Sequence, residues 1–515
     1  MNGAESLIRS LVDAGVDTCF ANPGTSEMHL VQAIDAVSEM RPVLALFEGV
    51  CTGAADGYGR MTGRPAATLL HLGAGLGNGV ANLHNARRAS TPLLNVVGDH
   101  AIHHVPYDAP LTADIEGVAR PVSAWIRTAR TPQGLAGDGV DAVRAATTPN
   151  PDSLGNVATL IVPADCAWGE GHIARTREPA GTRASVADAA IEAAAGALGR
   201  TSILLLDGEA LGLTGLDAAG RIAQATGCRL FSTTFPARVE SGPGLPSVAR
   251  LPYFPEQVLE ALSGVAHLVL AGAQAPVSFF AYRGTASDLV PHDCEVVRLV
   301  HRHEDVVGAL VALADRLDAR APFAAVQAQR PTAPVGSLST RHVATALAAL
   351  APNDCIVSVD SGGGGAAYPA MQSAVRHTWL NLTGGSIGQG GPVATGAALA
   401  SPGRQVFALL GDGGAMYTNQ CLWTQAREGL DVITVIYSNR SYGILETEYR
   451  RLGINEIGDR AASLFDLSRP AIDWVALARS MGVPASRAET CDEFATALTR
   501  AVASEGPALI EAVVA

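Results

Sequence analysis

Short apolar runs alternate with amphipathic stretches along the whole chain. The apolar runs are rich in Val, Ile and Leu and have the length of buried β-strands. The amphipathic stretches repeat their apolar residues about every three to four positions, which is typical of helices that cover a sheet. The predicted strands include residues 42–47, 67–71, 93–98, 158–162, 203–206, 267–271, 295–300, 356–359, 405–410 and 432–437. The predicted helices include residues 4–14, 26–38, 187–198, 340–350, 472–481 and 491–502.

This alternation predicts parallel sheets with helices on both faces, and therefore the α/β fold class. Two segments, residues 171–185 and 320–337, have the polar or Pro- and Ala-rich composition of linkers. They divide the chain into three doubly wound blocks, which we expect to be domains. These blocks are residues 1–170, 186–320 and 338–515.

The charged residues exclude several kinds of chemistry. The chain carries 36 Lys+Arg against 49 Asp+Glu, a formal net charge of -13, and the sequence contains no lysine. A lysine Schiff base and a P-loop lysine are therefore excluded. The acidic balance argues against a nucleic-acid partner. A general bias of the composition toward arginine is sufficient to explain the missing lysine.

Cysteines and hydropathy indicate the compartment. The chain has 8 cysteines, and they form no CxxC pair or Cys/His cluster, so we expect reduced thiols in a cytoplasmic protein. The longest uncharged stretches are interrupted by Gly, Asn and Pro, so we expect no membrane partner. Residues 1–16 have the pattern of an amphipathic helix rather than that of a signal peptide.

Two polar residues follow predicted strands in the last block. Asp412 lies in a Gly-Asp-Gly-Gly sequence after one strand, and Asn439 follows the next. Because the carboxyl ends of parallel strands meet at one edge of a sheet, their oxygens suit a shared Mg²⁺ ion. Gly413 and Gly414 leave backbone N–H groups open to a phosphate. The plainer alternative is a strand end with Asp412 as a helix N-cap.

At this spacing, the Gly-Asp-Gly-Gly and Ser-Asn motifs resemble the cofactor motif of thiamine-diphosphate-dependent enzymes. Over nearly its whole length, the chain resembles the group of 2-keto acid decarboxylases and acetolactate synthases, and its motifs are closest to those of benzoylformate decarboxylase. The resemblance implies a pyrimidine-binding domain over residues 1–170, a middle domain over 186–320 and a diphosphate- and Mg²⁺-binding domain over 338–515.

The same resemblance implies thiamine diphosphate and Mg²⁺ as cofactors. The implied metal ligands are Asp412, Asn439 and the backbone oxygen of Ser441. The implied cofactor contacts are Gly362, Gly363, Gly385, Ile387, Gly413, Gly414, Ser441 and Tyr442. We expect no FAD, because the Arg-Phe-Asp-Asp-Arg-like stretch of acetolactate synthases is missing from the middle block.

The resemblance gives two residues a direct role toward the cofactor. Glu48 would contact N1′ of the aminopyrimidine, where a carboxylate favours the tautomer that removes the C2 proton and leaves a nucleophilic ylide. An ordinary acid at the beginning of a helix is the alternative for Glu48. Ile387 would lie under the bend between the two rings, where a bulky apolar side chain is required.

The residues around the reacting carbon separate the members of this group. Thr25 stands where benzoylformate decarboxylase has a substrate-binding serine, and His71 follows Glu48 at the offset of a catalytic histidine in that enzyme. A structural histidine at a strand end is the alternative for His71. Further candidates for the substrate site are Gly24, His103, His104, Phe280 and Leu445. Glu446, next to Leu445, is either adapted to the site or a surface acid.

The second catalytic histidine of benzoylformate decarboxylase is replaced here by Ala281. The resemblance therefore leaves two reactions open for a 2-keto acid: decarboxylation through an enamine to an aldehyde, or carboligation with an aldehyde or ketone acceptor. An acetolactate synthase-type transferase and a non-catalytic paralogue remain alternatives. A dinucleotide oxidoreductase is disfavoured, because the loop at residues 73–79 lacks GxGxxG spacing. The family implies a homodimer or homotetramer with active sites between subunits.

Overall fold

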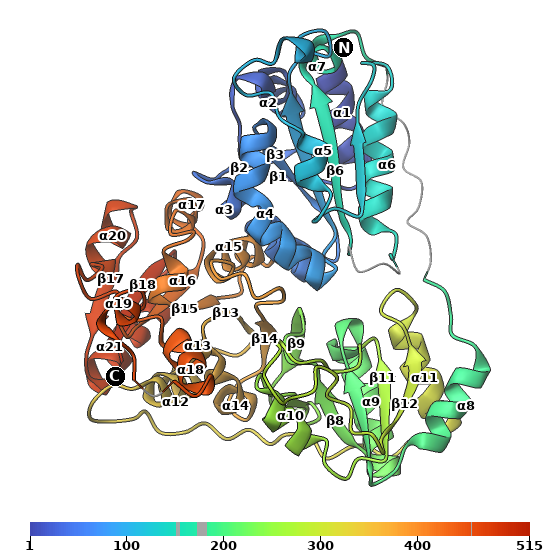
Figure 1. The fold of residues 1–515 in the computed structure, drawn as a ribbon, viewed down its shortest axis with the longest axis vertical. Helices are drawn as coiled ribbons and strands as arrows, with labels where there is room; N and C mark the ends of the chain where they lie inside the picture. The colour runs from blue at the N-terminus through green and yellow to red at the C-terminus, as the bar shows by residue number, and fades with distance from the viewer. Residues whose placement is uncertain (151–154, 173–182, 455, 515) are drawn as a thin grey trace. The chain divides into compact units, whose positions relative to one another are not determined.

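The computed structural model describes residues 1–150, 155–172, 183–454 and 456–514. The chain forms two compact units. Unit 1 consists of Met1–Ala180, Arg330–Met371 and Leu382–Ala515. Unit 2 consists of Gly181–Gln329 and Gln372–Asn381. Figure 1 shows that helices and strands alternate through both units.

The N-terminal part of unit 1 is a parallel sheet in the order β2-β1-β3-β4-β6-β5. Its strands are β1 (Thr18–Asn22), β2 (Arg41–Leu44), β3 (Ala66–Leu70), β4 (Leu93–Asp99), β5 (Trp125–Thr128) and β6 (Val157–Pro163). Its helices are α1 (Gly3–Asp13), η1 (Thr25–Glu27), α2 (Met28–Ala36), α3 (Glu48–Thr62), α4 (Leu72–Ala89), η2 (Val105–Tyr107), α5 (Ile115–Ala119), α6 (Leu135–Thr147) and α7 (Ala164–Trp168). The central strands are buried on both faces, which explains their continuous apolar runs.

Unit 2 contains a second parallel sheet in the order β10-β8-β7-β11-β12. Its strands are β7 (Ser202–Leu206), β8 (Arg229–Ser232), β10 (Ala249–Arg250), β11 (His267–Ala271) and β12 (Glu295–Val300). Its helices are α8 (Asp188–Ala197), η3 (Gly208–Leu211), α9 (Leu213–Thr226), α10 (Pro255–Ala261) and α11 (Val306–Arg316). An antiparallel pair, β9 (Arg238–Ser241) and β14 (His377–Leu380), also belongs to this unit.

The C-terminal part of unit 1 contains five strands in the order β17-β18-β16-β15-β13, all parallel. They are β13 (Cys355–Asp360), β15 (Val406–Gly411), β16 (Val432–Ser438), β17 (Ala485–Ala488) and β18 (Ala508–Val513). The helices of this segment are α12 (Thr340–Leu350), α13 (Gly362–Gly365), α14 (Ala367–Gln372), α15 (Gly390–Ala400), α16 (Asp412–Ala415), α17 (Cys421–Glu428), α18 (Gly443–Arg451), α19 (Asp459–Ala462), α20 (Trp474–Ser480) and α21 (Cys491–Val502).

Helices α3 and α15 pack against each other and join the two parts of unit 1. Their contact depends on glycine, because a side chain at Gly57 would collide with the Val393 carbonyl, and one at Gly396 with the Ala54 carbonyl. Both helices are almost entirely buried. The small residues of each helix therefore let two backbones approach closely.

The predicted α/β class is confirmed by the three sheets. Two local predictions are wrong. The strand predicted at residues 42–47 ends at Leu44, and the glycine-rich stretch at residues 73–79 is not a loop but the first turns of α4. That stretch is helical because it packs closely: a side chain at Gly79 would meet Thr52 at 2.8 Å. Most of the linker predicted at residues 171–185 lies outside the described residues.

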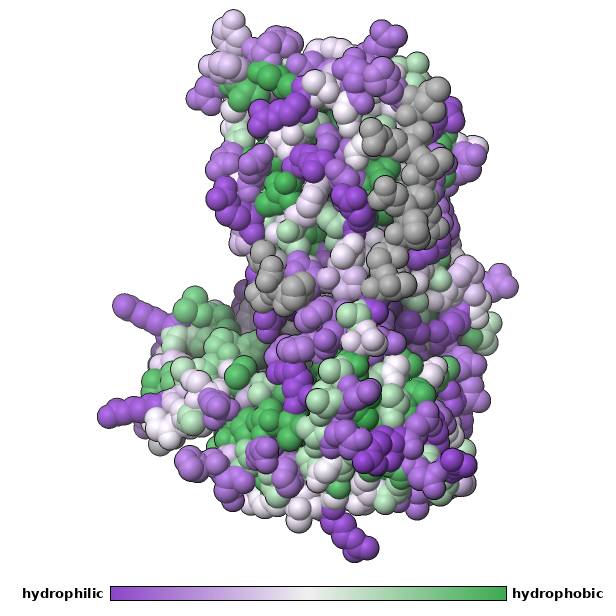
Figure 2. Space-filling view, turned by 90° about the vertical axis from the view of Figure 1, so that its right-hand side faces the viewer, coloured by the Kyte–Doolittle hydropathy of each residue, from purple (hydrophilic) through white to green (hydrophobic). Residues whose placement is uncertain are grey.

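Figure 2 shows hydrophilic residues spread over one face of the molecule, with hydrophobic residues in small groups between them. Among the described residues, no helix combines the length and the apolar character that crossing a bilayer requires.

Candidate active site

Glu48 is the first residue of α3 and is buried, with 7% of its surface exposed. Its carboxylate lies at the positive end of the helix, where a negative charge is stabilised. One oxygen, Oε2, accepts a hydrogen bond from Asn78 Nδ2 at 3.0 Å. The other, Oε1, lies 3.2 Å from the point that a Cβ at Gly75 would occupy. Glu48 thus has a side-chain amide and a glycine beside it.

His71 follows β3 and belongs to a hydrogen-bonded group with Glu27 and Ser26. Glu27 is fully buried, and its Oε2 lies 2.8 Å from His71 Nδ1 and accepts from the backbone N–H of Gly24 at 2.7 Å. Ser26 Oγ donates to Glu27 Oε1 and lies 3.1 Å from His71 Nδ1. The carboxylate therefore holds one ring nitrogen of His71 and leaves Nε2 for another partner.

Glu27 does not stand out in the sequence as a site residue. Its position one residue after a serine, just before a helix, is typical of a surface acid. The available signal was two glycines, Gly24 and Gly98, that lie beside this group in the fold. A side chain at Gly24 would collide with the His71 ring, and one at Gly98 with the Glu27 carboxylate. Thr25, predicted to face the substrate, lies in η1 with an exposed side chain, and Ser26 rather than Thr25 contacts His71.

His103 and His104 lie in the segment after β4. The side chain of His103 is 72% exposed, and its Nδ1 is 3.7 Å from a carboxylate oxygen of Asp165. The ring of His104 lies between those of His100 and Tyr107, with centroid distances of 5.4 and 5.9 Å. His104 thus belongs to a row of rings on an exposed segment, and His103 lies beside Asp165.

Asp412 and Asn439 lie at the carboxyl ends of the neighbouring parallel strands β15 and β16. Asp412 is buried, and its oxygens accept backbone N–H groups of Gly413 at 2.8 Å and Arg440 at 2.6 Å. Burial raises the pKa of its carboxyl group. Asn439 is exposed, and its Oδ1 accepts from the backbone N–H of Ser441 at 3.1 Å.

These oxygens have the chemistry of a site for a divalent cation. Within the described chain, no arginine or histidine nitrogen forms a salt bridge with the buried Asp412 carboxylate. Carboxylate, amide and backbone oxygens are the ligands that Mg²⁺ takes in proteins, together with phosphate and water. The donor set therefore fits a magnesium ion that carries a diphosphate.

Glycines line the backbone around this site. Gly362 begins α13 directly after β13, and a Cβ placed there would meet no atom within 4 Å. Gly363 and Gly413 lie against the rings of Tyr437 and Tyr442, respectively. Open glycine backbone and short helix beginnings are suited to a phosphate group.

The loop between β14 and α15 carries Gly385 and Ile387. Gly385 and Gly388 have φ angles of +76° and +93°, in the left-handed region that favours glycine. Asn85 of α4 anchors the beginning of the loop, since its Oδ1 accepts from the backbone N–H groups of Gly384 at 3.1 Å and Ser386 at 3.2 Å. Its Nδ2 donates to the Ser386 carbonyl at 2.8 Å.

The remaining candidates are Leu445 with its neighbour Glu446 on α18, and Phe280 in unit 2. Glu446 is already paired, because its Oε1 accepts from Ser441 Oγ at 3.1 Å and its Oε2 lies 3.4 Å from Arg450. Leu445 is 43% exposed. In unit 2, Phe280 is 54% exposed, and its ring meets that of Phe279 at 4.9 Å.

Two family models match the chain. The model for the thiamine pyrophosphate enzyme, N-terminal TPP binding domain, matches residues 1–118, and the model for the C-terminal TPP binding domain matches residues 362–512. A Mycobacterium tuberculosis protein, provisionally named acetolactate synthase large subunit IlvX, is 51% identical over 100% of this chain and 99% of its own length. The chain belongs to the thiamine-diphosphate-dependent enzymes.

Other relatives of this enzyme have related names. Benzoylformate decarboxylase from Pseudomonas aeruginosa is 28% identical over 96% of each chain. The solved 4-hydroxybenzoylformate decarboxylase of Rhodococcus jostii RHA1 shares the fold with a TM-score of 0.88, covering 100% of this chain and 99% of its own, at 24% identity. The predicted family is confirmed, and so is the expectation of an enzyme with decarboxylase and acetolactate synthase relatives.

Proposed function

We propose that this enzyme is a lyase or carboligase that uses thiamine diphosphate and Mg²⁺ to remove CO₂ from a 2-keto acid, yielding an aldehyde or an acyloin. The observation that carries the proposal is the buried Asp412 carboxylate, which has no salt bridge within the described chain and lies beside Asn439 at the ends of adjacent strands. A cation with a phosphate ligand would neutralise that charge. When bound, thiamine diphosphate supplies the electron-accepting chemistry of decarboxylation.

Residues of the C-terminal segment, 338–515, would hold this cofactor. Asp412, Asn439 and the backbone oxygen of Ser441 would bind Mg²⁺. The backbone at Gly362, which has open space beside it, and that at Gly363, Gly413 and Gly414, with the Tyr442 side chain, would receive the diphosphate. Gly385 and Ile387 would contact the pyrimidine and the bend between the rings.

Glu48 would hold a proton at N1′ of the aminopyrimidine. Its burial at the beginning of α3 removes water from the carboxylate, and Asn78 fixes one of its oxygens. A carboxylate held in this way can form one short, directed hydrogen bond to a ring nitrogen. The first segment, residues 1–170, would thus be the pyrimidine-binding domain, and residues 186–320 the middle domain.

His71 would move a proton at the reacting carbon, with Nδ1 held by Glu27 and Nε2 directed to the substrate. Since the chain has no lysine, the keto acid carboxylate would be met by arginine, histidine, hydroxyl or backbone N–H groups, with Gly24 and Thr25 as candidates. The exposed Phe280 offers an apolar surface for the side chain of the substrate or acceptor.

Carboligation is favoured over simple decarboxylation by one residue. Ala281 stands at the position of a second proton-donating histidine, so protonation to an aldehyde has one donor fewer and a carbonyl acceptor competes better. The alternative is an acetolactate synthase-type transferase, in line with the name of the Mycobacterium tuberculosis relative. We propose no FAD. We further propose a cytoplasmic homodimer or homotetramer, in which Glu48 serves cofactor held by Asp412 of the partner subunit.

Product analysis tests this function. Purified enzyme with thiamine diphosphate and Mg²⁺ is incubated with a panel of aliphatic and aromatic 2-keto acids, with and without aldehyde acceptors. We expect CO₂ release with at least one keto acid, and an acyloin when an acceptor is present. Cofactor binding without turnover of any keto acid would contradict the proposal and favour a non-catalytic paralogue.

A further inference from the structure

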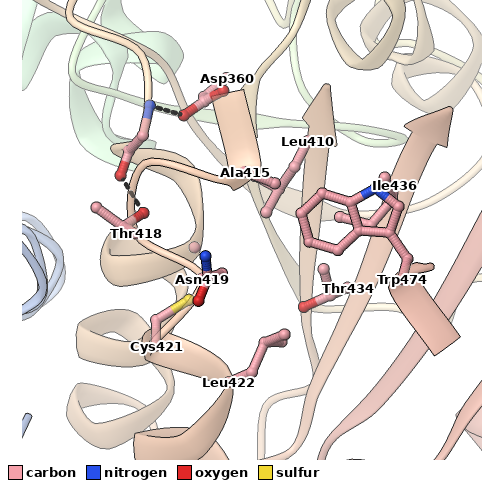
Figure 3. Close-up of a pocket in the computed structure, with 12 residues that line it drawn as sticks. Asp360, Leu410, Ala415, Thr418, Asn419, Cys421, Leu422, Thr434, Ile436 and Trp474 are labelled. Carbon is pink, nitrogen blue, oxygen red and sulfur yellow. Dashed lines mark hydrogen bonds between the residues drawn. The ribbon is translucent and has the colours of Figure 1, made fainter. Parts of the chain in front are cut away.

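Two buried side chains bind the backbone of Gly388, one at its N–H group and the other at its carbonyl group. Asp360, the last residue of β13, accepts the Gly388 N–H at 2.8 Å through Oδ2. Thr418 Oγ1 donates to the Gly388 carbonyl at 2.6 Å. Figure 3 shows both hydrogen bonds, with Asp360 and Thr418 on opposite sides of the loop backbone.

Asp360 is an unusual residue for this position. It is 5% exposed, makes no salt bridge in the described part of the chain, and its Oδ1 has no hydrogen-bond partner there. Burial raises the pKa of its carboxyl group to about 6. Its Oδ2 also accepts the Gly390 N–H at 3.0 Å. A buried carboxylate is costly for folding, and the hydrogen bonds from the loop backbone offset part of this cost.

The two side chains join separate segments of the proposed cofactor site. Asp360 lies at the end of the strand that leads to Gly362, and its Oδ1 is 3.0 Å from the point that a Cβ at Gly414 would occupy. Ile387 Cβ is 3.6 Å from the same point. Thr418 follows the Gly-Asp-Gly-Gly turn in the chain. The diphosphate-side turn and the pyrimidine-side loop are therefore linked through Gly388.

We propose that Asp360 and Thr418 are positioning residues that clamp Gly388, fix the wedge residue Ile387 beside it and so couple the two halves of the cofactor site. The inference rests on the proposed binding of thiamine diphosphate. Neither side chain needs to touch the cofactor, because each acts through the loop backbone.

The test compares two matched substitutions in one cavity. Thr418 and Thr434 both line the small cavity of Figure 3, but the Thr434 hydroxyl has no partner in the described chain. The dissociation constant of thiamine diphosphate, with saturating Mg²⁺, is measured by calorimetry on the full-length protein. Loss of one buried hydrogen bond in Thr418→Val should raise this constant about tenfold. Thr434→Val should leave it within about twofold, and Thr418→Ser should restore it.

Asp360→Asn keeps the shape and removes the charge, so it should weaken binding by about tenfold as well. Because both residues act on Gly388, their effects should not be independent. The increase in the dissociation constant of the double variant should be much smaller than the product of the two single increases. Equal binding by wild type, Thr418→Val and Asp360→Asn would overturn the clamp, as would an equal loss in Thr434→Val. If Asp360→Asn does not fold, the Thr418 series decides alone. Absence of binding by wild type would instead overturn the proposed function.

Discussion

Glu48 and Asp412 are both buried carboxylates, and each is the first residue of a helix. They differ in what holds them. Glu48 is bonded by the side-chain amide of Asn78, whereas Asp412 is bonded by the backbone N–H groups of Gly413 and Arg440. Backbone donors fix a carboxylate rigidly, which suits a bound cation. A side-chain donor allows small movements, which suits a group that shares a proton with a cofactor.

The same contrast applies to their neighbours. On the metal side, Asp360 accepts hydrogen bonds from backbone N–H groups, including those of Gly388 and Gly390. On the pyrimidine side, Glu27 binds the side chains of His71 and Ser26 as well as the backbone N–H of Gly24. We infer that the C-terminal segment is built to hold the cofactor and the N-terminal segment to transfer protons.

Removal of the Asp412 carboxylate should have the largest effect on binding. Asp412→Ala deletes the only carboxylate of the proposed metal site, so the dissociation constant of thiamine diphosphate with Mg²⁺ should rise by at least about a thousandfold. Calorimetric titration measures it. Asp431→Ala is the matched control, since Asp431 directly precedes β16, at its opposite end, and bonds Gln405. Binding retained in Asp412→Ala would contradict the metal site.

The pH dependence of stability should report Asp360. Its folded pKa of about 6 exceeds the usual value of 3.8, so the folded protein binds more protons, and the free energy of unfolding should fall as pH rises from about 4 to about 6. The difference of about two pKa units corresponds to about 3 kcal/mol. Urea unfolding of wild type and Asp360→Asn across this range measures it. An identical pH dependence in the two proteins would show that Asp360 ionises normally.

Loss of the Glu27 charge should slow catalysis without preventing cofactor binding. Glu27→Gln keeps the size but weakens the hydrogen bond that orients His71, so kcat should fall by about thirtyfold with little change in KM. Steady-state kinetics with the best keto acid measures both constants. Glu39→Gln is the control, because exposed Glu39 bonds its preceding serine, Ser38, just as Glu27 bonds Ser26. A kcat within twofold of wild type would remove Glu27 from the mechanism.

Substitution of Glu446 should have the smallest effect. Its carboxylate is paired with Ser441 and Arg450 on the surface of α18, so Glu446→Gln should change kcat by less than about threefold. The same kinetic assay measures it. A large loss would instead place Glu446 among the proton donors.

The sequence predicted the elements that depend on local pattern. Buried parallel strands appear in the sequence as apolar runs. The observed bounds of β11 and β12 match the predicted ranges. Two helices, α12 and α21, do so as well, because each has an amphipathic repeat and begins after a Ser or Thr N-cap. The family could also be predicted, since its cofactor motif is short and continuous in the chain.

The parts that depend on contacts distant in the sequence could not be predicted. The role assigned to Glu27 depends on its hydrogen bond with His71. That of Asp360 depends on its hydrogen bonds with Gly388 and Gly390, and all of these partners are distant in the sequence. The glycine-rich residues 73–79 have a poor helix propensity, yet they form α4 because only glycine fits against neighbours such as Thr52. Tertiary packing overrides the local preference at these positions.

The most direct test of the account is the rate at which the C2 proton of bound thiamine diphosphate exchanges with deuterium, followed by NMR after acid quench. Wild type and Glu48→Gln are compared at saturating cofactor. We predict that Glu48→Gln binds the cofactor within about threefold of wild type but exchanges the proton at least about a hundredfold more slowly, because the amide cannot hold a proton at N1′. An exchange rate equal to that of wild type would contradict the proton-transferring role of Glu48.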